Sequence, residues 1–275
     1  NEFNPALHAK TMDRIAARFA PDAVFFMMDL SLESGALGLP VRYPLYESPS
    51  VEEHPIREVS DLDALRVLDP LDDARLAGYI KTMELMKRSI SVPCAAYVAG
   101  PFTLAGLLMG ASDIAMATIT DPELVHEIVR FAQDICIRYS RALTEAGADM
   151  IVVLEPTATF LSPRSFATFC GTYVREVFEA PGMADMMVLH ICGDTTHILR
   201  EMCATGAHGL SLDAPVNMRA AAGVVDPDVV LIGNVDPVGV MLHRDAAGVA
   251  QAVRELLDTM SGVENFILST GCDLP

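Results

Sequence analysis

Residues 145–156 read EAGADMIVVLEP, and residues 204–215 read ATGAHGLSLDAP, which repeats the same order of features. In both stretches a glycine that ends a helix is followed by a short apolar segment, an acidic residue and a proline. A short, mostly apolar run without polar alternation is typical of a parallel strand that is buried on both faces. The two stretches therefore predict consecutive units of a parallel sheet.

The pattern extends outward from these two stretches over the rest of the chain. Seven strands are predicted, at residues 23–28, 94–99, 150–154, 186–191, 208–212, 228–232 and 265–269. Helical patterns separate them, at 5–19, 70–90, 121–145, 162–180, 195–203 and 245–260. Residues 31–40 are expected to form a small-residue turn, and residues 41–57 a long loop. Strands that alternate with helices favour a parallel sheet with helices on its outside.

Polar residues follow each predicted strand, namely Asp29, Thr103, Glu155, Cys192, Asp213, Asn234 and Cys272. In a barrel these residues would converge on one pocket at the C-terminal rim, whereas in an open sheet they would be spread along an edge. The sequence therefore predicts an α/β fold, a (β/α)8 TIM-type barrel with one unit missing or misread. We expect residues 1–275 to form a single barrel domain.

Composition limits the classes of partner. The net charge of −18 would repel nucleic acid, and Gly, Pro and Asp interrupt every hydrophobic stretch, so no membrane span is expected. The six cysteines are irregularly spaced, which is unlike a disulfide-linked secreted domain. The chain begins with Asn1 and shows no basic region followed by an apolar one. We therefore expect a cytoplasmic protein.

His190 and Cys192 are two residues apart in a predicted strand, so both side chains face the same side. With Cys272 they would offer one nitrogen and two sulfurs, the set that Zn²⁺ takes in a catalytic site with an open fourth position. Two thiolates make zinc a poor Lewis acid, which favours activation of a thiol over activation of water. The alternative interpretation is core packing, which we expect for Cys94, Cys136, Cys170 and Cys203.

Four motifs carry a resemblance to a known family: GPFTLAG at 100–106, HICG at 190–193, GNVDP at 233–237 and GCDLP at 271–275. They resemble the uroporphyrinogen decarboxylase superfamily and, within it, the methylcobalamin:coenzyme M methyltransferase branch. The resemblance implies a (β/α)8 barrel with zinc held by His190, Cys192 and Cys272. It also implies methyl transfer between a corrinoid protein, which carries the methyl-corrinoid, and a small thiol such as coenzyme M.

The remaining polar residues of the rim are expected to bind substrate. Glu155 or Asp213 would occupy the fourth zinc position at rest, and Thr103 and Asn234 would hydrogen-bond polar groups of the substrate. The alternatives are salt bridges or helix caps for the two acids, and turn stabilisation for Thr103 and Asn234. The identity of the thiol and the direction of transfer stay open.

Two other functions remain possible from the sequence. Asp29 matches the active-site aspartate of the decarboxylases in position, and we expect it to contact substrate. Family members also carry an N-terminal segment, which supplies the arginines of the decarboxylases, and a final helix, and neither is in this sequence. The alternatives are thus a decarboxylase-type lyase without metal and a non-catalytic barrel that binds a corrinoid or tetrapyrrole.

Overall fold

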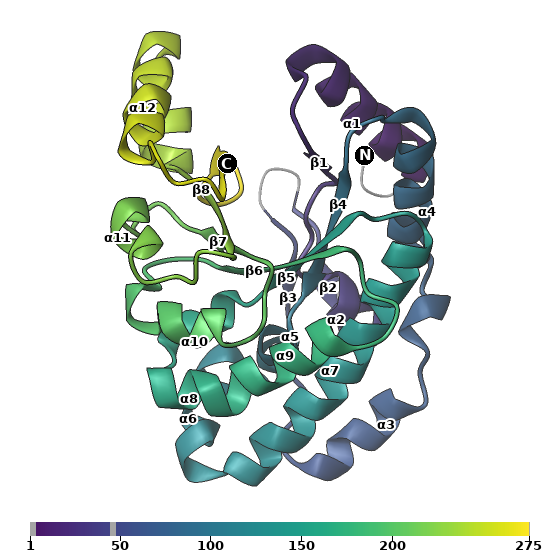
Figure 1. Ribbon diagram of the computed structural model, residues 1–275. Helices are drawn as coiled ribbons and strands as arrows, with labels where there is room; N and C mark the ends of the chain where they lie inside the picture. Colours follow the sequence, from purple (N-terminus) through teal and green to yellow (C-terminus); the bar gives the residue numbers. More distant parts are fainter. Residues whose placement is uncertain (1–3, 45–47, 275) are drawn as a thin grey trace.

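The computed structural model describes residues 4–44 and 48–274 and contains a seven-stranded parallel sheet (Figure 1). Its strands follow the order of the sequence, so each pairs with the next along the chain. The strands are β1 Val24–Phe25, β4 Cys94–Ala99, β5 Met150–Leu154, β6 Met186–Ile191, β7 Gly209–Leu212, β8 Val230–Val235 and β9 Phe266–Thr270. All seven predicted strands are confirmed, and their observed ends differ from the predicted ends by a few residues at most.

The sheet is curved, with β1 and β9 at its two edges, and helices cover its outer face (Figure 1). This is the strand order of a TIM-type barrel with one unit fewer than eight, as predicted. One boundary was wrong in a way that matters for the site. Asn234 lies inside β8 and not after it, because β8 keeps its parallel register with β9 as far as Val235.

The helices are α1 Pro5–Phe19, α2 Leu32–Ala36, α3 Asp63–Arg66, α4 Ala74–Ser89, α5 Pro101–Met109, α6 Ala111–Thr120, α7 Pro122–Glu145, α8 Pro163–Phe166, α9 Thr172–Glu179, α10 Leu199–Cys203, α11 Met218–Ala222 and α12 Ala246–Thr259. The N-terminus of α7 is capped by Asp121, whose carboxylate accepts from the N–H of Leu124. In the described residues no single helix is long and apolar enough to cross a membrane. One pair of consecutive helices, α5 and α6, would be long and apolar enough if taken together, but the two are bent by 102° relative to each other.

Residues 31–57 contain more structure than the sequence indicated. α2 lies within the expected turn. In the expected loop, of which residues 45–47 lie outside the described residues, β2 Val41–Arg42 and β3 Ser50–Val51 pair as antiparallel strands. α6 and α11 were not anticipated either. α2 and α11 have five residues each and β2 and β3 have two each, which are too few to display a periodicity, whereas α6 has ten.

Two hydrophobic cores lie on the two faces of the sheet. The small inner core is formed by Ala95, Met150, Val152, Leu154, Val188 and Ile232. The larger outer core packs the helices against the sheet and contains the intervening residues of the same strands, such as Ile151, Val153 and Leu189. Because side chains alternate along a strand, His190 points to the inner side, like Val188.

A buried carboxyl group on α2 predicts a pH dependence of stability. Glu33 is almost fully buried, and its Oε1 accepts from the N–H of Ala99 at 2.7 Å. Burial raises the pKa of Glu33 from its ordinary 4.5 to about 8. As the pH rises, the unfolded chain therefore releases this proton at a lower pH than the folded protein does. This contribution to stability is complete below about pH 4.5 and is lost as the pH rises through about 8.

We therefore expect Glu33→Gln, whose amide oxygen can still accept from the Ala99 N–H and which cannot ionise, to stabilise the protein at pH 9 but not at pH 4. The gain at pH 9 should be at least about 2 kcal/mol, since each pKa unit is worth about 1.4 kcal/mol. Urea unfolding of both proteins at the two pH values measures it. Glu264→Gln, at an exposed position, serves as the control. Equal stabilities of variant and wild type at pH 9 would contradict the prediction.

Candidate metal centre

β6 carries two of the predicted ligands to the inner side of the sheet. His190 lies in β6 and Cys192 directly follows Ile191, its last residue. Cys272 comes from the turn after β9, three strands away in the sheet order. The distances are 3.3 Å from His190 Nε2 to Cys192 Sγ, 3.5 Å between the two sulfurs and 3.9 Å from Cys272 Sγ to His190 Nε2. The fold thus brings the three side chains together.

These three separations lie within about 0.3 Å of those that a tetrahedral zinc ion would set. With zinc–sulfur bonds of about 2.3 Å and zinc–nitrogen bonds of about 2.0 to 2.1 Å in a tetrahedral site, neighbouring ligand atoms lie roughly 3.6 to 3.8 Å apart. Among the described residues, these three form the only group of three or more histidine, cysteine and acidic side chains that could hold a metal ion. The donor set and its spacing fit a site with a fourth position left for another ligand.

A hydrogen bond on the far side of the ring orients His190. Its Nδ1 lies 2.9 Å from Ser211 Oγ and 3.2 Å from the Ser211 carbonyl oxygen. His190 and Ser211 are register partners in the pairing of β6 with β7. The Nε2 atom consequently faces the two sulfurs.

Cys272 reaches the site because a glycine precedes it. The N–H of Gly271 donates to the Val235 carbonyl at 2.8 Å, which extends the pairing of β9 with β8. A Cβ atom at position 271 would lie 2.5 Å from the backbone nitrogen of Ala214. The close approach of two backbones therefore requires glycine here.

The two thiols share their protons unequally. Hydrogen bonding with Cys192, and after it the contact with His190, lower the pKa of the Cys272 thiol, against the opposing effect of its burial. The same contact with Cys272, followed by burial, raises the pKa of Cys192. A thiolate is the form of cysteine that binds a metal.

Asp213 and Asn234 lie beside this cluster and stabilise the loops around it. Asp213 Oδ2 accepts from the N–H of Gly193 at 2.7 Å, next to Cys192, and Oδ1 accepts from Ala214 at 2.6 Å. Asn234 Nδ2 donates to the carbonyl oxygens of Asp213 at 3.0 Å and Val216 at 2.7 Å. That Asp213 binds zinc and Asn234 binds substrate stays a prediction.

Glu155 and Thr103 lie together at the N-terminus of α5. The fully buried Glu155 carboxylate accepts from the backbone N–H groups of Phe102 at 2.9 Å and Thr103 at 2.7 Å. A Cβ atom at Gly100 would lie 2.4 Å from Glu155 Cδ, so this contact needs a glycine. Burial raises the pKa of Glu155 to about 7, even though these bonds lower it. The structure does not group Glu155 with the sulfur ligands, and its role as a ligand stays a prediction.

Asp29 forms a separate cluster after β1. Its side chain is fully buried and forms an ion pair with Arg75 of α4, while Oδ1 accepts from the Ser31 N–H at 2.9 Å and hydroxyl at 2.7 Å. Sequence reasoning missed Arg75, because the pair is separated by 46 positions and no motif joins them. It also missed Ser211, which a knowledge of the strand register would have revealed.

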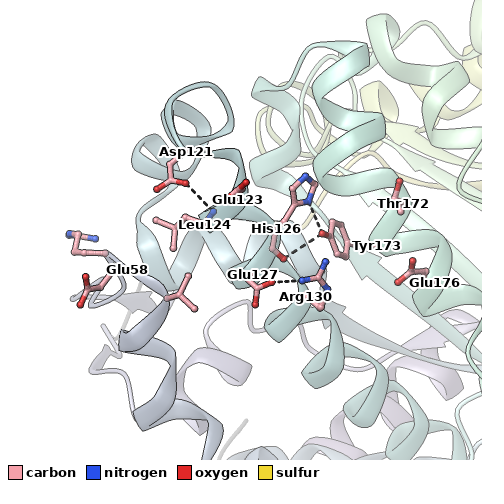
Figure 2. Close-up of a pocket in the computed structure, with 12 residues that line it drawn as sticks. Glu58, Asp121, Glu123, Leu124, His126, Glu127, Arg130, Thr172, Tyr173 and Glu176 are labelled. Atoms are coloured by element: carbon pink, nitrogen blue, oxygen red, sulfur yellow. Dashed lines mark hydrogen bonds and ion pairs between the residues drawn. The ribbon is translucent and has the colours of Figure 1, made fainter.

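A cavity outside the predicted site lies away from the sulfur cluster. It has a volume of about 780 Å³ and is lined by residues around 57–59, the first turns of α7 and the helix α9 (Figure 2). Inside it, His126 Nδ1 and the Tyr173 hydroxyl lie 2.7 Å apart, and Arg130 pairs with Glu127 at 2.5 Å (Figure 2). None of the predicted site residues lines this cavity.

Sequence comparison places the chain among known enzymes. The family described as Uroporphyrinogen decarboxylase (URO-D) matches residues 2–275. The chain is 29% identical to a methylcobamide:CoM methyltransferase, MtbA of Methanosarcina mazei, over 92% of its own length and 74% of the relative. It is 28% identical to the uroporphyrinogen decarboxylase of Desulfotalea psychrophila over 98% of its length and 79% of that relative.

Structural comparison gives the same grouping. A methyltransferase from Methanosarcina mazei superposes with a TM-score of 0.89 at 25% identity, covering 98% of this chain and 80% of that one. A putative vitamin-B12 independent methionine synthase from Listeria monocytogenes has a TM-score of 0.59 at 13% identity, over 98% of this chain and 80% of that one, which shows the fold alone. The chain belongs to the uroporphyrinogen decarboxylase family.

Proposed function

We propose that this protein is a zinc-dependent methyltransferase that moves a methyl group between the corrinoid of a partner protein and a small thiol. The observation that carries the proposal is the cluster of His190 Nε2, Cys192 Sγ and Cys272 Sγ, with separations of 3.3 to 3.9 Å. Decarboxylases and methylcobamide methyltransferases are similar to the chain at nearly equal identity, so identity alone does not choose between them. A metal-free decarboxylation gives no reason for one imidazole and two thiols to converge.

Each residue of the site has a separate role in this proposal. His190, Cys192 and Cys272 would hold zinc, which lowers the pKa of a bound thiol so that it is a thiolate at neutral pH. Asp213 fixes the backbone of Gly193 after the second ligand, and Asn234 fixes the loop that carries Asp213. The thiolate sulfur would bond to the methyl carbon as the carbon–cobalt bond breaks, with the electron pair left on cobalt. Correct placement of the two reactants would supply much of the acceleration.

An anaerobic assay with free methylcobalamin tests this proposal. We expect the zinc-loaded chain to convert methylcobalamin to the cobalt(I) form in the presence of a thiol, and zinc removal by a chelator to abolish the reaction. A panel of 2-mercaptoethanesulfonate, 2-mercaptoethanol, cysteamine and homocysteine identifies the acceptor. The proposal fails if the purified protein binds less than about half an equivalent of zinc. Decarboxylation of uroporphyrinogen that is insensitive to the chelator would support the lyase instead.

A further inference from the structure

We propose that Ser211 is a positioning residue whose hydroxyl fixes the tautomer and orientation of His190 for metal binding. This inference rests on the proposed function, since it concerns the same zinc site. Ser211 supplies no ligand atom, and no motif in the sequence marks it. The neighbouring strand β7 would thus control a ligand on β6 without contacting the metal.

The strand geometry places the Ser211 side chain on the ligand side of the sheet. Leu210 and Leu212 belong to the outer core, so the residue between them faces inward. The register of the two parallel strands sets Ser211 opposite His190. Strand pairing therefore places a polar hydroxyl beside the imidazole.

The contacts at Nδ1 decide which nitrogen carries the proton. A neutral imidazole has one N–H donor and one acceptor nitrogen. The Ser211 carbonyl oxygen, 3.2 Å from Nδ1, can only accept, and the hydroxyl oxygen at 2.9 Å can accept as well. Both contacts are satisfied when Nδ1 carries the proton. The lone pair is then on Nε2, which lies 3.3 Å from Cys192 Sγ and 3.9 Å from Cys272 Sγ.

The hydroxyl has an effect that the carbonyl cannot supply alone. It provides the shorter of the two contacts, and its position off the backbone restrains rotation of the ring. Outer partners of metal-bound histidines fix the ring orientation and typically contribute 10- to 100-fold in metal affinity. Ser211 is suited to this role, because its hydroxyl contacts a ligand and lies on a strand fixed between two neighbours.

Three substitutions at this position separate orientation from simple packing. Ser211→Ala removes the hydroxyl and should weaken zinc binding by at least about 10-fold. Ser211→Thr keeps the hydroxyl and should stay within about threefold of wild type, and Ser211→Asp offers a charged acceptor and should bind zinc more tightly. Ser269→Ala on β9 is the control, since Ser269 is half-buried at the same end of the sheet and is not a ligand.

Two measurements on the full chain read out the effect. Competition with a chromophoric chelator gives the zinc affinity of each metal-free protein, and the absorption spectrum of the Co²⁺-loaded protein reports the geometry of the site. We expect Ser211→Ala to change the cobalt bands while its thermal midpoint without metal stays that of wild type.

Equal zinc affinity and an unchanged cobalt spectrum in Ser211→Ala would overturn the inference, as would an equal loss in Ser269→Ala. Failure of the wild type to bind zinc is a different result, seen before any variant is made, and it would overturn the proposed function itself.

Discussion

A Cys272→Ala variant is expected to lose zinc and, with it, all thiol-dependent demethylation of methylcobalamin. The substitution leaves one nitrogen and one sulfur as ligands. Catalytic zinc sites have three protein ligands, so the two that remain should not retain the ion. Even the loss of an outer hydrogen-bond partner weakens such sites 10- to 100-fold, so removal of a ligand should weaken binding by more than about 100-fold. Metal analysis after gel filtration and the anaerobic assay measure the two losses.

The fold should survive this change. Cys272 is only partly buried and lies after the last strand, so its removal leaves no large cavity in either core. Cys203→Ala is the matched control, because Cys203 is also partly buried and lies outside the ligand group. It should keep a full equivalent of zinc. If Cys272→Ala retains zinc and activity at the level of this control, Cys272 is not a ligand.

A Gly271→Ala variant should weaken zinc binding at the same site, because it displaces the backbone that carries Cys272. The added Cβ would lie 2.5 Å from the nitrogen of Ala214 and 3.1 Å from the carbonyl carbon of Asp213. These are backbone atoms, so no change of rotamer relieves the overlap, and the chain at 271 has to move away from the loop after β7. Cys272 is the next residue and must move with it.

We expect this variant to lose about 1 to 3 kcal/mol of stability, as overpacked substitutions typically do, and to bind zinc at least about 10-fold more weakly. Urea unfolding of the metal-free protein and chelator competition provide the measurements. Gly78→Ala is the control: it lies in α4, the nearest atom to its new Cβ would be 3.6 Å away, and alanine favours a helix. Wild-type zinc affinity in Gly271→Ala would show that the backbone contact does not position Cys272.

Most strands of the sheet, from β4 to β8, were predictable because they are largely buried on both faces. A strand such as Met150–Leu154 has to be apolar at every position, and this requirement is visible without knowledge of its neighbours. The pairing of His190 with Cys192 followed in the same way, from the alternation of side chains along one strand. The short helix α2 and the hairpin of β2 and β3 escaped prediction, because contacts with the rest of the chain decide such short elements.

The roles of the rim residues could not be read from their position after a strand. Glu155 and Asp213 both follow strands and both are acidic, yet Glu155 caps the N-terminus of α5 and Asp213 binds the loop beside Cys192. The difference lies in which face of the sheet each side chain takes. Glu155 follows Leu154 of the inner core, whereas Asp213 follows Leu212 of the outer core.

The sequence by itself determined a parallel α/β sheet, its seven strands and a candidate set of one histidine and two cysteines. These features depend on local periodicity and on residue chemistry, which a single chain displays. Only the tertiary structure decided that Cys272 lies 3.5 Å from Cys192, that Arg75 pairs with Asp29 and that Ser211 contacts His190. Such contacts join residues far apart in the chain, and strand register and backbone approach fix them after the sheet has formed.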